Sequence, residues 1–495
     1  MDLASRVTPA TEPRSEAANG AAARPQDLRT FLERWEREHP EEIVHVEKPI
    51  DARFEVTALI TKLERQQKFP VVICHHVVSQ GRRLEYPLVT FMMSSRQRLA
   101  ELLEVPIDLL GREVYQRRND RQPLVVVDRA AAPVKEVVRT GADVDVTAFP
   151  APHHHEMDPG PYITAGFLTL YNPETGLDNS ALHRGWLKGP DEIRVYMTAS
   201  TDNNRIWLEN ERRNEDTRVA YWIGHHPLAV LGCESRVPVT ESHLAAAGGL
   251  LRQPLRLVPS ETLGDDFLVP ADAEVVIEGI IPAHERRPEG PFGEYPRYSG
   301  PQRWNPYIRV TAVTHRRDAY WHDLMVGHSH WVGSLNHEGH VYEVVKRVVP
   351  TLRQVYVPMS GTGHFHVYLR IEKNYDGLGK SALVAALGAD PRIKHAWVFD
   401  EDVDIMDEQE VLRAMATRFQ GDRDLIVISQ AVGPILDPSA SGITGAKVGF
   451  DCTRPAPPTP FSHRLSVPAD VLARIDPEEY IGRAKLAAIP HEPWG

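Results

Sequence analysis

The heptapeptide Pro288–Glu294 (PEGPFGE) places two carboxylates five residues apart, with Gly, Pro and Gly between them. Pro291 removes a backbone donor and the glycines permit unusual dihedral angles, so the segment predicts a shaped loop and not a helix. On a helix, paired acids stand three or four residues apart, whereas here each carboxylate is set by its own turn. From this stretch alone, a solvated surface loop with incidental acids is an equally good interpretation.

The loop lies inside a long β-rich region that runs from Tyr162 to about His315. Many short strands with Gly and Pro turns favour a barrel or sandwich over a parallel sheet. We therefore expect residues 129–325 to form a central β-barrel or sandwich domain. The strand-like runs are 162–171, 193–198, 219–223, 274–281 and 307–313.

Helices and strands alternate on both sides of this region. Leu28, Phe31, Leu32 and Trp35 recur at helical spacing and open an expected N-terminal α/β domain over residues 25–128. After Gly333 the alternation returns, which predicts a C-terminal α/β oligomerisation domain. We place this domain at 326–467, a disordered leader at 1–24 and a helical arm at 468–495, with helices over 471–475 and 477–486.

Composition narrows the function classes. At 495 residues the chain predicts roughly three domains. A formal charge of −12 argues against nucleic acid as a partner, because phosphate binding needs concentrated Lys and Arg. No apolar run is long enough to span a membrane, and the N-terminus lacks the apolar core of a signal peptide. Three separated cysteines, Cys74, Cys233 and Cys452, fit a reduced cytoplasm.

Three other stretches carry groups that suit a phosphate-bearing cofactor. Asn179 and Arg184 stand five residues apart, Glu241 opens an expected helix, and Lys447 follows two small residues. Amide and carboxylate oxygens are ligands that Mg²⁺ or Mn²⁺ prefers, and a lysine on a small-residue loop suits a phosphate. Each residue also has a plain structural interpretation: a turn, a helix N-terminal acid and a solvated side chain.

Taken together and in order, these pieces resemble the UbiD-type decarboxylases, and the resemblance covers most of the chain. EGPFGE is its most specific part, and the resemblance implies that the central domain, residues 129–325, is a split β-barrel of the flavin-binding kind. The resemblance implies prenylated FMN as cofactor, supplied by a partner flavin prenyltransferase, and reversible removal of CO2 from an aromatic, heteroaromatic or α,β-unsaturated carboxylic acid. The matching segments are Asn179 with Arg184, Val239–Glu241, Glu289–Glu294 and the segment ending at Lys447.

The resemblance implies that Arg184, Glu289 and Glu294 form the catalytic network, acting on a covalent adduct between substrate and cofactor. Residue chemistry agrees, because an sp² carbon that loses CO2 needs an electron sink that no side chain supplies. Arg184 can orient the substrate acid. Glu294 would protonate the carbon, and burial beside Glu289 would raise its pKa.

The resemblance also implies a cofactor and metal site. Asn179 and Glu241 match the family's ligands for Mn²⁺ or Mg²⁺, and the backbone near Ser180 and Cys233 matches a K⁺ site. The family's third metal ligand, commonly a histidine, has no match, so Asp202 takes that position in our prediction. The expected cofactor-binding residues are Asn179, Ser180, Leu182, His183, Arg184, Cys233, Glu241 and Lys447.

Two histidine-rich segments offer further chemistry. The run His153–Glu156 could be a zinc site, although adjacent residues on an extended segment point to opposite faces. The segment Gly327–Ser334 matches the family's substrate pocket, which implies His328, His330, Trp331 and Val332 as lining residues. Polar rings there would suit an acid with a ring heteroatom or hydroxyl. A subunit contact is the alternative for the two histidines.

The leading hypothesis is a cytoplasmic carboxy-lyase that assembles as a homodimer or a higher homo-oligomer. A flavin-binding oxidoreductase is the first alternative, although no GxGxxG follows a strand. A metallohydrolase built on the histidine run is the second, and zinc without flavin absorbance would distinguish it.

Overall fold

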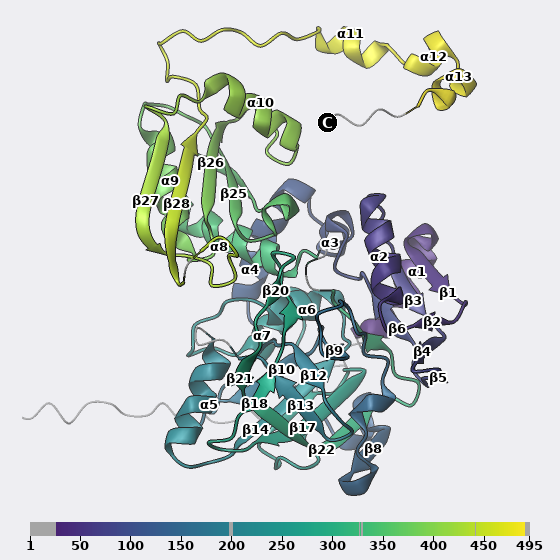
Figure 1. The fold of residues 1–495 in the computed structure, drawn as a ribbon. Helices are drawn as coiled ribbons and strands as arrows, with labels where there is room; N and C mark the ends of the chain where they lie inside the picture. Colours follow the sequence, from purple (N-terminus) through teal and green to yellow (C-terminus); the bar gives the residue numbers. More distant parts are fainter. Residues whose placement is uncertain (1–25, 198–200, 326, 328–329, 441, 491–495) are drawn as a thin grey trace, which may run out of the picture.

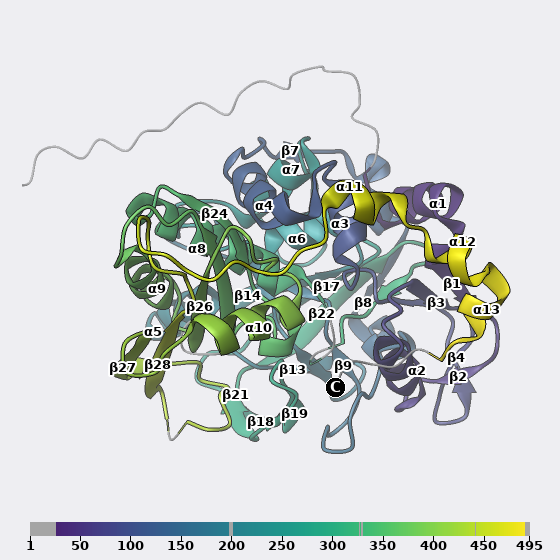
Figure 2. The same cartoon turned by 90° about the horizontal axis from the view of Figure 1, so that it is seen from above.

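A computed structural model describes residues 26–197, 201–325, 327, 330–440 and 442–490 (Figure 1). Its mixed α/β, multidomain architecture confirms the expected fold class. The N-terminal elements lie beside a curled central sheet, and the C-terminal sheet packs across one end of both (Figures 1 and 2). The predicted leader lies outside the described residues. Among the described helices, none is long and apolar enough to cross a bilayer.

The N-terminal part is a small sheet covered by helices. Helix α1 (Leu28–Glu38) buries the predicted apolar face, and Asp27 caps it by accepting from the backbone of Thr30. The sheet order is β1-β3-β6-β23, so a strand from residues 321–322 completes it. The other elements are β1 (Ile43–Val46), β2 (Ile50–Asp51), α2 (Glu55–Arg65), β3 (Val71–Cys74), β4 (Val77–Ser79), β5 (Arg82–Arg83), β6 (Leu88–Thr90), α3 (Arg96–Leu102), α4 (Leu110–Asn119), β7 (Val125–Val126) and β23 (Trp321–His322).

The central sheet has nine strands and curls into a half-barrel. Its order is β11-β10-β14-β17-β22-β13-β12-β9, with β8 paired to β22. Buried side chains pack on both faces of β14, β17 and β22, which holds the curl in the core. The strands are β8 (Val137–Thr140), β9 (Tyr162–Ile163), β10 (Phe167–Tyr171), β11 (Asp178–Leu182), β12 (Gly185–Leu187), β13 (Glu192–Val195), β14 (Thr217–Ile223), β17 (Val275–Ile281) and β22 (Tyr307–His315).

Helices and short strands surround this sheet. Strand β7 from the N-terminal part pairs with β15, so the chain does not change domain at a single residue. The predicted limits of the domains therefore stay predictions. The surrounding elements are α5 (Asp202–Arg212), α6 (Pro227–Cys233), α7 (His243–Leu251), β15 (Arg256–Pro259), β16 (Leu268–Pro270), β18 (Arg287–Glu289), β19 (Phe292–Gly293), β20 (Ser299–Gly300) and β21 (Arg303–Asn305).

The C-terminal part is a five-stranded sheet of order β24-β25-β26-β28-β27, and it confirms the predicted return of α/β alternation. After it, the arm carries short helices with no buried residue and runs away from the sheet (Figure 1). The elements are α8 (Val332–Val348), β24 (Leu352–Tyr356), β25 (His366–Ile371), α9 (Leu378–Ala389), β26 (His395–Asp400), α10 (Glu408–Arg418), β27 (Leu425–Val432), β28 (Thr444–Asp451), α11 (Ala469–Arg474), α12 (Pro477–Ile481) and α13 (Arg483–Ala488).

Candidate active site

The heptapeptide that opened the sequence analysis is a shaped loop between two short strand ladders. Glu289 ends β18, which pairs with β21, and Glu294 follows β19, which pairs with β20. Gly290 between them has φ of 81°, in the left-handed region that favours glycine. A Cβ there would lie 3.3 Å from the Nη2 atom of Arg184. The loop therefore fixes both acids and leaves room for an arginine.

Arg184 enters this space from the link between β11 and β12. Its Nε and Nη2 atoms donate to the two oxygens of Glu289 at 2.9 and 2.8 Å. Its Nη1 atom donates to Glu294 Oε1 at 2.5 Å. The structure thus brings the three predicted catalytic side chains together, although 105 and 110 residues separate the arginine from the two acids. Their catalytic roles stay predictions.

The cluster is buried and walled by aromatic rings. The side chain of Glu289 is fully buried, and those of Arg184 and Glu294 are 7% and 14% exposed. The guanidinium carbon lies 4.3 Å from the ring centre of Tyr196 and 5.1 Å from that of Phe292. Such walls exclude water and strengthen the electrostatic interactions inside.

The charges of this cluster do not balance, because one guanidinium faces two carboxyl groups. Burial raises the pKa of Glu294, Arg184 lowers it by a smaller amount, and Glu289 raises it further. Burial opposes the charge on Arg184, but its bonds to the acids keep the pKa of the guanidinium raised. Glu294 is consequently the acid in this cluster whose environment favours the protonated form.

Tyr162 is a member of the cluster that the sequence did not reveal. Its hydroxyl donates to Glu289 Oε1 at 3.1 Å, and its ring packs 4.1 Å from that of Phe292. Burial and the neighbouring Glu289 raise the pKa of this hydroxyl, so it remains a donor. Tyr162 belongs to β9, which pairs with β12 just after Arg184. Only that pairing, which no local pattern predicts, brings it to the site.

Several of the predicted cofactor-binding residues gather on strand β11 and its C-terminal end. Ser180 is fully buried. Its hydroxyl lies 2.7 Å from the hydroxyl of Thr169 and accepts a hydrogen bond from the indole N–H of Trp222 at 3.0 Å. The thiol of Cys233 lies 3.7 Å from the Ser180 carbonyl oxygen. The backbone N–H of Leu182 donates to Glu234.

His183, which follows β11, is also buried. Its Nδ1 atom lies 3.0 Å from the carbonyl oxygen of Tyr196, and burial lowers the pKa of its imidazole. The ring is therefore neutral near neutral pH and holds the link between β11 and β12 in place, next to Arg184.

The side-chain amide of Asn179 has a defined orientation. Asn203 Nδ2 donates to the carbonyl oxygen of Leu168 at 2.9 Å, and a carbonyl can only accept. The oxygen of Asn203 must then face Asn179, which donates to it at 2.7 Å. Within the described chain, the Asn179 oxygen therefore accepts no hydrogen bond and can receive a cation or a donor.

The remaining predicted ligands have other partners. Asp202 is 39% exposed and pairs with Arg205 at 3.4 Å. Glu241 pairs with Arg121. The neighbour of Glu241, Ser242, donates to Asp178, which precedes Asn179. This contact places the start of α7 beside the strand that carries Asn179.

Lys447 lies in another domain, on β28. Its ammonium is buried and donates to the carbonyl oxygens of Leu387 and Asp390 at 2.8 Å each. Burial lowers the pKa of this lysine. The structure thus gives Lys447 no contact with the residues on β11, and its role as a phosphate ligand stays a prediction.

The histidine run does not form a metal cluster. His153 contacts the backbone of Asp158, His154 is buried against Asp323 at 3.2 Å, and His155 contacts the carboxylate of Asp158. The described residues contain no group of three or more His, Cys, Asp or Glu side chains that could hold a metal ion. This removes the observation on which the metallohydrolase alternative depended.

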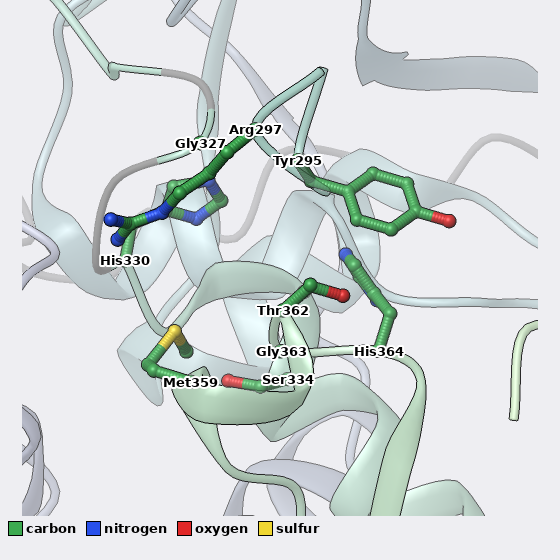
Figure 3. Close-up of a pocket in the computed structure, with 10 residues that line it drawn as sticks. Tyr295, Arg297, Gly327, His330, Ser334, Met359, Thr362, Gly363 and His364 are labelled. Atoms are coloured by element: carbon green, nitrogen blue, oxygen red, sulfur yellow. The ribbon is translucent and has the colours of Figure 1, made fainter. Parts of the chain in front are cut away.

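A cavity adjoins the loop that carries Glu294, and Figure 3 shows the residues around it. Of the predicted pocket residues, His330 lines the cavity and His328 lies outside the described residues. Trp331 and Val332 instead pack in the hydrophobic core, where the Trp331 indole donates to the carbonyl of Ser94. The helix that begins at Val332 turns these two side chains away from the cavity.

The predicted segment Gly327–Ser334 contributes four of the residues that line this cavity. The other lining residues come from the turn after Glu294 and from the segment before β25, and the sequence did not reveal them. The position of Tyr295 directly after Glu294 was a usable signal, whereas nothing local indicated the residues before β25. The full set is Tyr295, Arg297, Gly327, His330, Gly333, Ser334, Met359, Thr362, Gly363 and His364.

Comparison with family models matches three consecutive parts of the chain. Residues 36–118 match the 3-octaprenyl-4-hydroxybenzoate carboxy-lyase N-terminal domain. Residues 125–329 match the Rift-related domain of the same carboxy-lyase, and residues 330–452 match its C-terminal domain.

Individual proteins show the same similarity. The anhydromevalonate phosphate decarboxylase of Methanothermobacter thermautotrophicus is 30% identical over 433 residues, covering 86% of this chain and 97% of that protein. The UbiD-class enzyme HmfF from Pelotomaculum thermopropionicum, in complex with FMN, has a TM-score of 0.85 at 33% identity, covering 92% of this chain and 100% of HmfF. An evolved dimeric form of HmfF in complex with prFMN has a TM-score of 0.82 at 32% identity and the same coverage.

Proposed function

The chain belongs to the UbiD family of carboxy-lyases, and on that premise we propose that it decarboxylates an unsaturated carboxylic acid reversibly and without net oxidation. The substrate is an aromatic, heteroaromatic or α,β-unsaturated acid, and the cofactor is prenylated FMN. The observation that carries this proposal is the buried cluster in which Arg184 holds both Glu289 and Glu294. A cluster with one cation and two acids favours a stored proton, which this reaction requires.

Prenylated FMN, when bound, supplies the electron sink for the charge that develops when the carbon–carbon bond to CO2 breaks. The chain supplies the proton that replaces CO2. Glu294 has the raised pKa and partial exposure that a general acid needs near neutral pH. One carbon–carbon bond breaks and one carbon–hydrogen bond forms, so the acid becomes CO2 and the corresponding compound with hydrogen in place of the carboxyl group, with no oxidant or reductant.

Arg184 and Glu289 hold that proton donor in position. Glu289 occupies the Nε and Nη2 side of the guanidinium, which fixes its plane. A guanidinium carries five N–H donors, so two remain on Arg184 for a substrate carboxylate. We assign substrate orientation to Arg184 and the positioning of Arg184 to Glu289.

Asn179 on β11 and Glu241, which precedes α7, fit a divalent cation beside a phosphate. Asn179 offers a free amide oxygen of fixed orientation, and Glu241 offers a partly buried carboxylate close to the same strand. Mg²⁺ and Mn²⁺ commonly take one or two protein ligands and complete their shell with phosphate and water. Asp202 is left out of this assignment because it is exposed and paired with Arg205.

Asn203 takes the role of orienting residue in this proposal. By accepting from the Asn179 amide nitrogen, it turns the Asn179 oxygen toward the cation. A K⁺ ion near the Ser180 carbonyl and Cys233, and a phosphate contact from Lys447, complete the proposed cofactor site. Lys447 would exchange its bonds to two backbone carbonyls for that contact.

Co-expression with a flavin prenyltransferase, followed by anaerobic screening of furan, pyrrole, indole, phenolic and cinnamic acids, tests the function. We expect CO2 release with at least one acid, and none from protein made without the prenyltransferase. Size determination of the same protein tests the expected homodimer. CO2 release that is independent of the prenyltransferase, or loaded enzyme that is inactive on every class, would contradict the proposal.

A further inference from the structure

The histidine run and the residues that follow it contact the loop that carries Glu294. Asp158, two residues after the run, has a fully buried side chain. Its Oδ1 atom accepts a hydrogen bond at 3.3 Å from the backbone N–H of Gly293, which directly precedes Glu294. A hydrogen bond to an ionised carboxylate is stronger than one between neutral groups. The contact therefore ties the loop to a residue 135 positions earlier in the chain.

His155 contacts both Asp158 and the loop. The other carboxylate oxygen of Asp158 accepts from the His155 backbone N–H at 2.9 Å, and the Nδ1 atom of His155 lies 3.2 Å from the same oxygen. A Cβ at Gly293 would lie only 2.8 Å from that Nδ1 atom. Position 293 therefore needs glycine, and the close packing leaves the loop no room to shift toward the ring.

The segment that carries these two residues is itself anchored to the N-terminal part. The backbone N–H of His153 donates to the carbonyl oxygen of Ala52 at 3.0 Å, and its carbonyl oxygen accepts from Phe54 at 2.9 Å. The neighbouring His154 is buried and lies 3.2 Å from Asp323. These contacts on both sides of the backbone give Asp158 a fixed support from which to hold the loop.

The position of Glu294 depends on the short ladder that contains Gly293. Strand β19 ends at Gly293 and pairs with β20, and the backbone N–H of Glu294 donates to the carbonyl oxygen of Tyr298 at 2.9 Å. A Cβ at Gly300 on β20 would lie 3.0 Å from Oε1 of Glu294. The carboxyl group of Glu294 thus lies against the backbone of the ladder, so a displacement of the ladder also displaces the proton donor.

We infer that Asp158 is a positioning residue for the reaction. Through the N–H of Gly293 it holds Glu294 where its proton can reach the substrate carbon, and His155 keeps the carboxylate of Asp158 in place. Glu289, which belongs to the separate ladder of β18 and β21, stands outside this arrangement. Binding of the substrate carboxylate at Arg184 should therefore not depend on Asp158. This inference rests on the proposed function.

Asp158→Asn tests the inference in the enzyme loaded with prenylated FMN. Asparagine has one acceptor oxygen, so it cannot accept from both Gly293 and His155. We expect kcat per flavin-loaded molecule to fall roughly 10- to 100-fold, because a displacement of about 1 Å in a reacting group has an effect of that size. KM should change by less than about twofold, since the contacts of Arg184 remain. His155→Ala should lower kcat in the same way but less.

Amide hydrogen exchange of the peptide covering residues 288–300, measured by mass spectrometry, gives a readout that does not depend on turnover. In Asp158→Asn this peptide should exchange roughly tenfold faster than in wild type. Asp451→Asn is the matched control, because Asp451 is also buried and accepts from a backbone N–H, that of Thr453 at 3.1 Å, at the end of β28. Its kcat and the exchange of residues 288–300 should equal those of wild type.

The outcomes separate this inference from the proposed function. Unchanged exchange in the loop, or faster exchange with an unchanged kcat, would overturn the positioning role while leaving the decarboxylase intact. A fall in kcat/KM that comes entirely from KM would overturn it too. If Asp158→Asn does not fold, His155→Ala decides, because its ring is 36% exposed, and a wild-type kcat there overturns the inference. Loaded wild type that releases CO2 from no acid would refute the proposed function, whereas the exchange comparison would still decide whether Asp158 holds the loop.

Discussion

Two buried arginine–glutamate clusters in this protein differ in the balance of their charges. Arg96 on α3 donates from both Nη atoms to the two oxygens of Glu338 on α8, at 2.8 Å each, with side chains 6% and 2% exposed. Arg184 makes the same two-pronged contact with Glu289 but also holds Glu294. The first cluster is neutral as a pair, whereas the second has one acid in excess.

The difference separates a structural role from a chemical one. The Arg96 pair joins the N-terminal part to α8, and Glu338 accepts a further bond from the Val357 backbone at 3.1 Å. With all of its charge matched, the pair has no group left to exchange a proton. In the Arg184 cluster, protonation of one acid removes the excess negative charge. Glu294 is the acid nearer to solvent. The predictions below test this distinction.

Glu294→Gln should have the largest effect on turnover. Glutamine keeps the shape and the contact with Arg184 but cannot deliver a proton, so we expect kcat to fall by roughly 10³-fold. CO2 release and flavin absorbance measure this, and the variant should retain its flavin. Because the pKa of Glu294 is raised in the folded state, its ionisation costs stability as pH rises through that value, and glutamine avoids this cost.

A melting temperature equal to or above that of wild type near neutral pH is therefore part of the expectation for Glu294→Gln. Turnover close to that of wild type would remove Glu294 from the mechanism. A variant that loses both flavin and stability would show that this cluster is structural, like the Arg96 pair.

Arg96→Met should show the opposite pattern. It leaves Glu338 buried without its partner, so we expect a loss of about 3–5 kcal/mol in stability, measured by urea unfolding. The double variant Arg96→Met with Glu338→Met removes both charges and should recover most of this loss. Turnover per folded molecule should change little in the double variant. A double variant as unstable as the single one would show that the pair contributes more than charge balance.

Asn203→Leu extends the comparison to a pair of neutral side chains. Here the group without a partner in the described chain is the amide oxygen of Asn179. Without its acceptor on Asn203, the Asn179 amide is free to rotate, and metal affinity should fall roughly 10- to 100-fold. Metal and flavin content of the purified protein measure this independently of activity.

A further variant makes the Asn203 result specific. Asp202→Asn should leave metal content near that of wild type, because Asp202 is 39% exposed and pairs with Arg205. If Asp202→Asn strips the metal while Asn203→Leu does not, the sequence-based prediction of Asp202 as the ligand is the correct one.

Much of the fold could be predicted because its signals are local. The apolar spacing of Leu28, Phe31, Leu32 and Trp35 corresponds to the buried face of α1, and the β-rich region corresponds to the curled sheet. The meeting of Arg184 with the two acids was expected only through the family resemblance, since no periodic pattern joins residues more than 100 positions apart.

The site residues that could not be predicted from the sequence depend on the packing of elements that are distant along the chain. Tyr162 and Asn203 reach the site through the register of the central sheet and the docking of α5 against it. Thr362 and His364 line the cavity with Tyr295 only because the C-terminal part of the chain packs there. Trp331 and Val332 failed to line the cavity because the start of α8, which no cap residue marked, decides the direction of their side chains.

Tyr162→Phe should produce the smallest effect. It tests how a hydrogen bond to Glu289 influences the protonation of Glu294. A reaction that needs Glu294 protonated runs fully at pH values below its raised pKa and slows as pH rises through it. The Tyr162 hydroxyl stabilises the ionised form of the cluster by donating to Glu289. Without this donor the negative charge of the cluster is less well stabilised, so Glu294 holds its proton more tightly and the alkaline limb of the kcat–pH profile should move up by less than about one pH unit.

Tyr196→Phe is the matched control for that shift. The ring centre of Tyr196 also lies close to Arg184, 4.3 Å from its guanidinium carbon. In the described chain, however, the Tyr196 hydroxyl makes no hydrogen bond to either acid. Its alkaline limb should stay in place, because the acids keep the same donors. If Tyr162→Phe leaves the limb unmoved, or moves it to lower pH, the hydrogen bond from Tyr162 does not help to set the protonation of Glu294, and the unbalanced charge of the cluster does not control its acid.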